Sequence, residues 1–195
     1  ASDIAEEIFD KTPVINSELI NRDELSSNIV KARRQLMYKM LQDGSLSKLG
    51  YEGYPADAGL YYTVLHDSGL HMNRGRLGWA FGKPKDDGGN GTSYQNLWLE
   101  TEGIFKNAED KVRLDEIYSV WQSAPYGLKK GVMPIIALAF FLANKSHIAI
   151  YFDEDRLVQP MPSIVCDLAS IQIISKQSFP PYCKQKNENE LDDCQ

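Results

Sequence analysis

The chain has 195 residues, of which 43% are hydrophobic and 25% are charged, and its formal net charge at pH 7 is −6. This composition is typical of a folded globular protein and excludes a largely disordered chain. The longest apolar run, from Val132 to Ala143, is shorter than the roughly 20 residues that span a membrane. The negative charge disfavours nucleic acid as a general partner, although a local basic face remains compatible with one.

The cysteines indicate the cellular compartment. Cys166, Cys183 and Cys194 lack the spacing of metal ligands or of a redox pair, and an odd number without a CxxC motif is typical of a reducing environment. No signal peptide is visible, because Ala1 opens directly into an acidic amphipathic segment. We therefore expect a cytoplasmic protein without a metal or cofactor. The missing initiator Met favours a piece of a longer chain or a processed terminus.

The first half of the chain has mainly helical patterns. Residues 4–9 predict a short helix that ends before Pro13, and residues 26–42 predict the strongest helix, with its apolar residues on one stripe. A further helix is predicted over residues 55–67, because a proline can start a helix and Ser68-Gly69 stops it. Residues 78–81 predict a short strand. The glycine-rich loop 83–90 is the clearest break in the chain.

The second half begins with helices predicted over residues 94–108 and 114–122. A turn at residues 124–131 leads into a wholly apolar helix over residues 134–143. Residues 147–159 predict a β-hairpin with the acidic tip Asp153-Glu154-Asp155, and residues 164–174 predict a helix or a strand. From residue 178 onward the chain is polar and without periodicity, which predicts a disordered tail.

The order of these elements predicts the fold class. Helix, strand, tight turn and strand is typical of a winged-helix unit, so we expect an α+β fold that is mostly helical, with winged-helix-like units and short β-hairpins. We divide the chain into a helical lobe (1–90), a winged-helix-like lobe (91–177) and a polar tail (178–195). Each lobe offers an amphipathic helix pair and then aromatic, strand-like residues, so two related units in tandem are an alternative to one.

Arg33 falls near the middle of the apolar stripe of the helix at 26–42. The structural interpretation is a buried ion pair or stack, with Glu52 or Asp67 as partner, and we favour it. The functional alternative is a phosphate or carboxylate contact where the two lobes meet.

Two modest basic patches are present, one formed by Arg22, Lys31, Arg34 and Lys39 and one by Lys129 and Lys130 beside Tyr126. In a winged-helix domain such residues contact phosphates, but the acidic tip at 153–155 would repel a duplex, so a solvated surface is favoured. The residues that we predict to contact a partner or nucleic acid are Arg22, Lys31, Arg33, Arg34, Tyr126, Lys129 and Lys130.

No catalytic constellation is visible in the sequence. His66, His71 and His147 have no ligand spacing, and Ser68 and Cys166 have no base that can be placed. The glycines at 86–91 lack the phosphate-loop pattern, which favours a flexible connector. Six aromatic residues fit core packing better than base stacking: Trp79, Phe81, Trp98, Phe105, Trp121 and Tyr126.

Several short motifs resemble a region of very large bacterial P-loop ATPases, which are similar to proteins encoded beside phage-defence and restriction genes. The motifs are Asn21-Arg22, Ser26-Ser27 with Ala32-Arg33-Arg34, Glu52-Gly53-Tyr54-Pro55, Ser68-Gly69-Leu70-His71, Gly78-Trp79 with Phe81-Gly82, and Pro125 to Gly131. The resemblance covers residues 1–176 and implies a helical, winged-helix-like segment beyond the nucleotide-binding core. Because the phosphate loop is absent from this chain, the resemblance does not imply ATP hydrolysis by these residues. It implies a role in assembly or in coupling the motor to a partner.

We therefore expect a non-catalytic interaction or regulatory module of a larger bacterial defence NTPase. It would dock on a partner protein or on the rest of its own chain, without a membrane. The alternative is a winged-helix domain that binds DNA and regulates transcription, and a third candidate is a small enzyme whose site is assembled only by the fold.

Overall fold

The computed structural model describes residues 7–86, 88, 90–109, 111–152, 156–158 and 173–176. Within them the chain is an α+β protein that is mostly helical, as expected from the sequence. Residues 7 and 8 of the short helix predicted at 4–9 are helical, whereas its residues 4–6 fall outside this range. The acidic tip at 153–155, the three cysteines and the predicted tail also lie outside it.

The N-terminal half contains two helical regions and a small hairpin. Helix α2 (Ser27–Gln42) buries Ala32, Leu36, Met37 and Met40, which confirms the predicted stripe. A 3-10 turn, η1 (Ser47–Gly50), follows it. The helix predicted at 55–67 consists of two parts, because α3 (Ala56–Leu60) passes directly into a π-helical turn, η2 (Tyr61–His66).

Strands β1 (His71–Asn73) and β2 (Trp79–Phe81) pair antiparallel, with His71 opposite Phe81. The single strand predicted at 78–81 is therefore one arm of a hairpin. The connection between the strands is a 3-10 turn, η3 (Gly75–Leu77). Its first residue, Gly75, and the residue that follows it, Gly78, have φ angles of +69° and +68°. Such angles favour glycine, since other residues meet steric strain there.

The C-terminal half supplies three helices and a second sheet. Helices α4 (Asn90–Asn107), α5 (Leu114–Gln122) and α6 (Met133–Ala143) agree with the predicted ranges to within a few residues. The strands are β3 (Val112–Arg113), β4 (Ile148–Phe152), β5 (Arg156–Val158) and β6 (Ile173–Lys176), in the order β3-β6-β4-β5. All neighbours are antiparallel, and the hairpin predicted at 147–159 is confirmed as β4 and β5.

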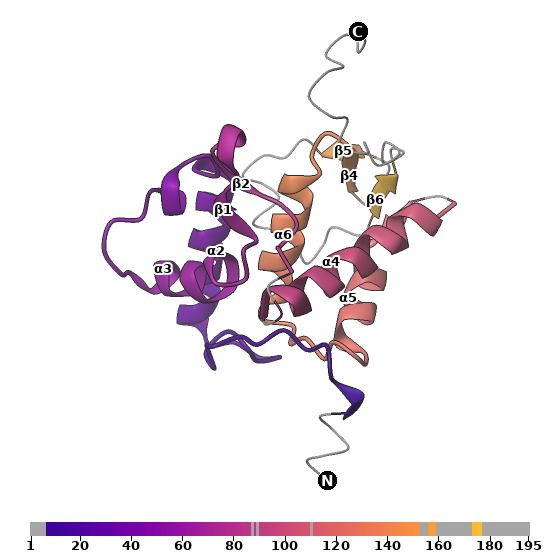
Figure 1. Cartoon of the computed structure of the whole chain (residues 1–195), viewed down its shortest axis with the longest axis horizontal. Helices are drawn as coiled ribbons and strands as arrows, with labels where there is room; N and C mark the ends of the chain where they lie inside the picture. Colours follow the sequence, from indigo (N-terminus) through magenta and orange to yellow (C-terminus); the bar gives the residue numbers. More distant parts are fainter. Residues whose placement is uncertain are drawn as a thin grey trace, which may run out of the picture.

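Helix α6 lies at the centre of the molecule, with α2 and the β1–β2 hairpin on one side and α4 and α5 on the other (Figure 1). Its residues are almost all buried, because an all-round apolar helix is stable only inside a core. The Phe140 ring lies 4.7 Å from that of Trp98 and 5.7 Å from that of Phe105, which ties α6 to α4. One hydrophobic cluster joins residues from both sides of the boundary that we predicted at residues 90 and 91.

Candidate interaction surface

Five of the seven predicted contact residues lie in or beside the turn that precedes α6, namely Arg22, Arg33, Tyr126, Lys129 and Lys130. The guanidinium of Arg33 donates from Nη1 to the carbonyl oxygen of Gly131, at 3.0 Å. The amide of Gly131 in turn donates to the carbonyl oxygen of Arg22, at 2.8 Å. One glycine thus links α2, the segment ahead of it and the turn. We call this arrangement the Gly131 junction.

The Gly131 junction leaves no space for a side chain. A Cβ atom at residue 131 would overlap the carbonyl oxygens of Ile20 and Arg22 and would come within 2.8 Å of Leu25 Cδ2. Ile20 itself is fully buried, which anchors the N-terminal segment against the core.

The guanidinium of Arg33 is half-buried and is held by a backbone carbonyl rather than by the predicted carboxylates. Burial lowers the pKa of Arg33, and the charge of Arg34 adds to this effect, whereas Tyr118 opposes it. Asp67, one of the two expected partners, accepts a hydrogen bond from the ring of His66 instead. Arg33 therefore contacts the backbone of the turn rather than a carboxylate, and the choice between a structural and a functional role for it stays a prediction.

Lys129 and Lys130 lie at the surface beside the Gly131 junction. Lys129 Nζ lies 3.5 Å from Asp23 Oδ2, and the amide of Lys130 donates to Asp23 Oδ1 at 3.2 Å. Asp23, which the sequence analysis did not single out, therefore ties the basic pair to the N-terminal segment. In the sequence, only the two adjacent lysines pointed to such a residue, because a carboxylate partner is expected near two adjacent cations.

Tyr126, the remaining turn residue, is a core residue that is only 4% exposed. Its hydroxyl lies 3.5 Å from both Glu100 Oε2 and the carbonyl oxygen of Asn96 on α4. Burial, with the nearby Glu100 carboxylate, raises the pKa of Tyr126 to about 12. Its ring is therefore a neutral structural support for the turn. Arg22, Lys31 and Arg34 have exposed side chains, and none of them lines the grooves described next.

Two shallow grooves flank the N-terminal segment where it crosses the turn. The first, of about 580 Å³, is lined by Phe9, Thr12, Asp23, Gln122, Gly127, Leu128, Lys129 and Lys130. The second, of about 460 Å³, is lined by Lys11, Asn96, Leu99, Glu100, Gly103, Ile104, Asn107 and Tyr126. Each groove contains one exposed apolar side chain, Phe9 (41% exposed) in the first and Leu99 (45% exposed) in the second. Ile8, Val14 and Leu19 of the N-terminal segment are 49–58% exposed. We call this region the turn surface.

The packing of the N-terminal segment onto the turn is close but sparsely bonded. A Cβ atom at Gly127, where φ is +61°, would lie 2.9 Å from the ring of Phe9. Thr12 Oγ1 lies 3.5 Å from the carbonyl oxygen of Pro125, which is at the limit of a hydrogen bond. Two features therefore require glycine at position 127, the positive φ angle and the close approach of the Phe9 ring.

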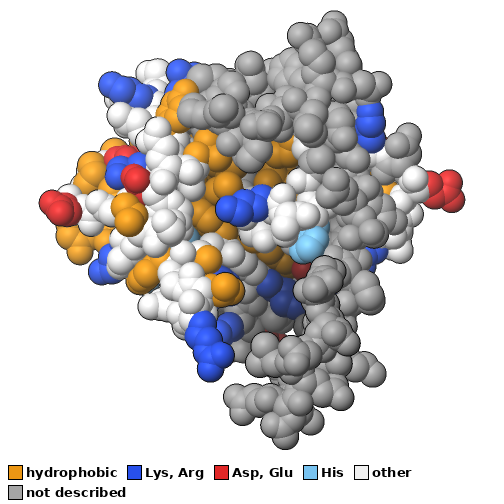
Figure 2. All heavy atoms as spheres, turned by 90° about the horizontal axis from the view of Figure 1, so that it is seen from above, with side chains coloured by type: hydrophobic (Ala, Val, Ile, Leu, Met, Phe, Trp, Pro, Cys, Tyr) orange, Lys and Arg blue, Asp and Glu red, His pale blue; other side chains and the backbone are white. Residues whose placement is uncertain are grey.

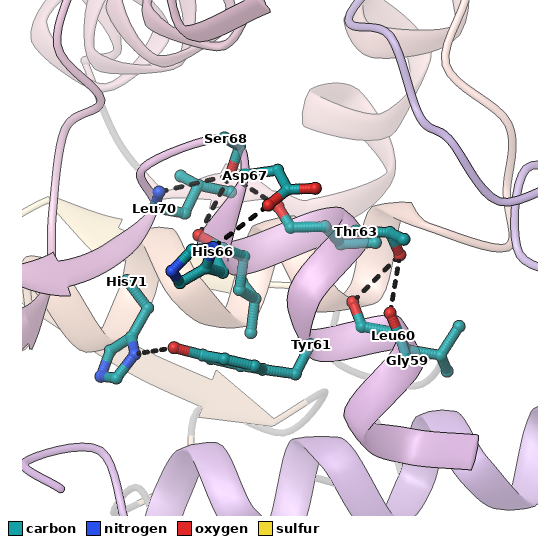
Figure 3. A network of polar contacts seen from close by, with 11 residues as sticks. Gly59, Leu60, Tyr61, Thr63, His66, Asp67, Ser68, Leu70 and His71 are labelled. Carbon is teal, nitrogen blue, oxygen red and sulfur yellow. Dashed lines mark hydrogen bonds and ion pairs between the residues drawn. The ribbon is translucent and has the colours of Figure 1, made fainter. Parts of the chain in front are cut away.

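A second polar cluster lies between η2 and the hairpin (Figure 3). The Nε2 atom of His71 lies 2.9 Å from the carbonyl oxygen of Gly44, and its Nδ1 atom lies 3.1 Å from the hydroxyl of Tyr61. Because a carbonyl only accepts, Nε2 must carry the proton, and the Tyr61 hydroxyl must donate to Nδ1. His71 is fully buried and neutral, and burial lowers its pKa.

Ser68 and His66 are each bonded within this same region. The Ser68 hydroxyl is buried, lies 2.6 Å from the carbonyl oxygen of Val64 and accepts the amide of Leu70. His66 is exposed and its Nδ1 atom lies 3.1 Å from Asp67 Oδ1. Because Ser68, His66 and His71 each already have a hydrogen-bond partner within the protein, we interpret this cluster as structural.

Arg74 is the second half-buried arginine, and no sequence pattern pointed to it. Its guanidinium donates to the carbonyl oxygens of Ala80, Lys83 and Gly69, at 3.1–3.2 Å. Burial lowers its pKa. Three carbonyl oxygens around one guanidinium close the base of the β1–β2 hairpin against the loop that follows it.

In comparisons with known proteins, no family model, no curated protein and no solved structure matches the chain. Among the described residues, no group of three or more His, Cys, Asp or Glu side chains is arranged to hold a metal ion. In the same part of the chain, no helix is both long and apolar enough to cross a membrane.

Proposed function

We propose that this chain is a non-catalytic interaction module that docks through the turn surface on a partner protein or on another part of its parent chain. The observation that carries the proposal is the pair of grooves beside the turn, each with an exposed apolar side chain, Phe9 in the first and Leu99 in the second. A cluster of large apolar side chains at a surface marks an interaction site more often than scattered ones do.

The lysine pair indicates which charge the partner of the turn surface carries. Lys129 and Lys130 stand at the rim of the first groove, beside the exposed ring of Phe9. Apolar side chains at the centre and charges at the rim are the usual arrangement of a protein interface. Rim charges select and steer partners more than they add affinity, so the lysines favour an acidic partner.

The resemblance to bacterial P-loop ATPases of defence loci suggests what the partner is. Under this proposal the chain is a cytoplasmic segment of such an ATPase, and the turn surface couples the motor to its target or to a neighbouring domain. The proposal rests on the short motifs in the sequence, several of which fall at the Gly131 junction, including Asn21-Arg22 and Pro125 to Gly131.

Site-specific photocrosslinking tests the proposal. A photoreactive amino acid is placed at Leu99 or at Lys130, one in each groove, and at Leu77 as control, since Leu77 is 79% exposed and lines neither groove. In its native cells the protein should give one discrete adduct from both groove positions and none from Leu77. Equal labelling from all three positions, or none from the grooves, would contradict the proposal, as would nucleotide turnover by the purified chain.

The alternative function is a winged-helix domain that binds DNA. It is favoured by one observation: α2, the α3–η2 segment and the β1–β2 hairpin follow one another, and the exposed Arg76 lies in the hairpin turn. The exposed Lys31 and Arg34 would add phosphate contacts from α2. A gel mobility shift with duplex DNA at low salt discriminates the two functions, since the interaction module predicts no shift at micromolar protein.

A further inference from the structure

Three aromatic rings of the N-terminal half contact one another in a row beside α3 and along η2; two of them are exposed and the middle one is half-buried. The Tyr54 side chain is 87% exposed, and its ring centroid lies 5.7 Å from that of Tyr62. The Tyr62 ring lies 5.6 Å from the exposed ring of His66, one turn further along η2. We call Tyr54, Tyr62 and His66 the aromatic row. None of them lines either groove of the turn surface.

Carboxylates lie beside the aromatic row and beside the rings that adjoin it. At one end Asp67 Oδ1 lies 3.1 Å from His66 Nδ1. Tyr51, whose ring adjoins the row through Tyr61, donates from its hydroxyl to Asp57 Oδ2 at 2.7 Å, and the exposed Glu52 precedes Tyr54 in the sequence. Figure 2 shows acidic side chains among hydrophobic ones at its left edge, on the side where α3 lies in Figure 1.

The same aromatic cluster already holds one cation of the chain itself. Lys39 Nζ lies 4.8 Å from the centroid of the Tyr51 ring, and it also pairs with Asp43. The Tyr51 ring is 5.7 Å from Tyr61, whose ring is 5.1 Å from Tyr62, so the contacts are continuous with the aromatic row. A cation over a tyrosine face is attracted by the ring electrons, and nearby carboxylates add to the attraction.

From this arrangement we propose that the aromatic row binds the arginine or lysine side chains of a basic segment of a partner protein. Tyr54 offers nearly its whole ring at little entropic cost, because tyrosine has few rotatable bonds. The three carboxylates complement a positive partner and repel the phosphates of a nucleic acid. This site is separate from the turn surface, and it does not depend on the function proposed for that surface.

The test uses the full 195-residue chain and a short peptide of alternating Arg and Gly, followed by NMR of the tyrosine rings at physiological salt. A matched peptide with citrulline in place of each Arg keeps the planar group and removes the charge. We expect saturable shifts of the Tyr54 and Tyr62 ring signals with the Arg peptide and none with the citrulline peptide. Tyr54→Ala should weaken binding about two- to five-fold, the usual effect of one exposed cation–π contact.

Two further variants separate the aromatic contact from general attraction to an acidic protein. Tyr54→Phe keeps the ring face and should bind like the wild type, whereas Leu77→Ala, at another exposed position, should have no effect. Equal binding of both peptides, or a loss of affinity with Tyr54→Phe as large as with Tyr54→Ala, would overturn the proposal. So would saturation of the same rings by oligothymidylate, because that result would make the row a base-stacking surface.

Discussion

Gly131 joins three parts of the chain through its backbone alone, since both its amide and its carbonyl are used and a side chain would meet two carbonyl oxygens. Sequence reasoning placed Arg33 correctly on the apolar stripe of its helix, because helical periodicity is a local property. It did not find the acceptor, which lies 98 residues further along the chain. Contacts at such separations are decided by packing, which leaves no local pattern.

Replacing Gly131 with Ala should lower the free energy of unfolding by about 2–4 kcal/mol, because the new methyl group must displace the segment at Ile20 and Arg22 and break the junction. The matched control is Gly103→Ala in α4, where a Cβ atom meets nothing within 4 Å. That change should stabilise the helix by about 0.5–1 kcal/mol. Denaturant midpoints of both variants measure the difference, and an unchanged midpoint for Gly131→Ala would contradict the described packing.

His71 should make stability depend on pH. Burial lowers its folded pKa, so on acidification the unfolded chain binds a proton first, at about 6.5, and the folded state loses stability. The loss begins as the pH falls through the unfolded pKa and ends at the lower folded pKa, with a slope of at most about 1.4 kcal/mol per pH unit. Above about pH 7.5, His71 no longer makes stability depend on pH, because it is neutral in both states.

Urea unfolding at pH 7.5 and 5.5 measures this effect of His71. His71→Gln should remove most of the decrease, whereas His66→Gln, which changes an exposed histidine, should keep it. If the wild type and His71→Gln lose equal stability on acidification, the neutral hydrogen-bonded state assigned to His71 is wrong.

Secondary structure was the most predictable scale. The apolar stripe of α2, the proline near the start of α6 and the acidic turn between two strand-like segments of the β4–β5 hairpin are local patterns, and each gave the correct element. The π-turn of η2 was not predictable, since its first residues continue a normal helical pattern and the added residue is fixed by packing of Tyr61 and Leu65 in the core. The winged-helix interpretation and the two-lobe division stay predictions.

The β1–β2 hairpin depends on Arg74 for its base. Arg74→Lys should cost about 1–3 kcal/mol, since one ammonium cannot reach the three carbonyl oxygens that the planar guanidinium contacts. Arg76→Lys, in the exposed turn of the same hairpin, should leave the thermal midpoint unchanged. Amide exchange of Met72 and Ala80 should rise in Arg74→Lys alone; similar exchange in both variants would contradict this assignment.

At the scale of the whole molecule, one hydrophobic cluster includes residues on both sides of positions 90 and 91. We therefore expect the two predicted lobes to unfold together. Variants that keep only Trp79 or only Trp121 report on the first and the second half, and their fluorescence transitions in urea should coincide. Two separate midpoints would mean that the lobes are independent domains after all.

The central position of α6 has a consequence for synthesis. A ribosome makes α2, the hairpin, α4 and α5 before Met133 emerges, so the faces that α6 will cover stay exposed to water until that point. Nascent chains that expose such faces tend to aggregate or to recruit chaperones. Release of the growing polypeptide ahead of the apolar helix would leave a product with these faces uncovered, which quality control should degrade.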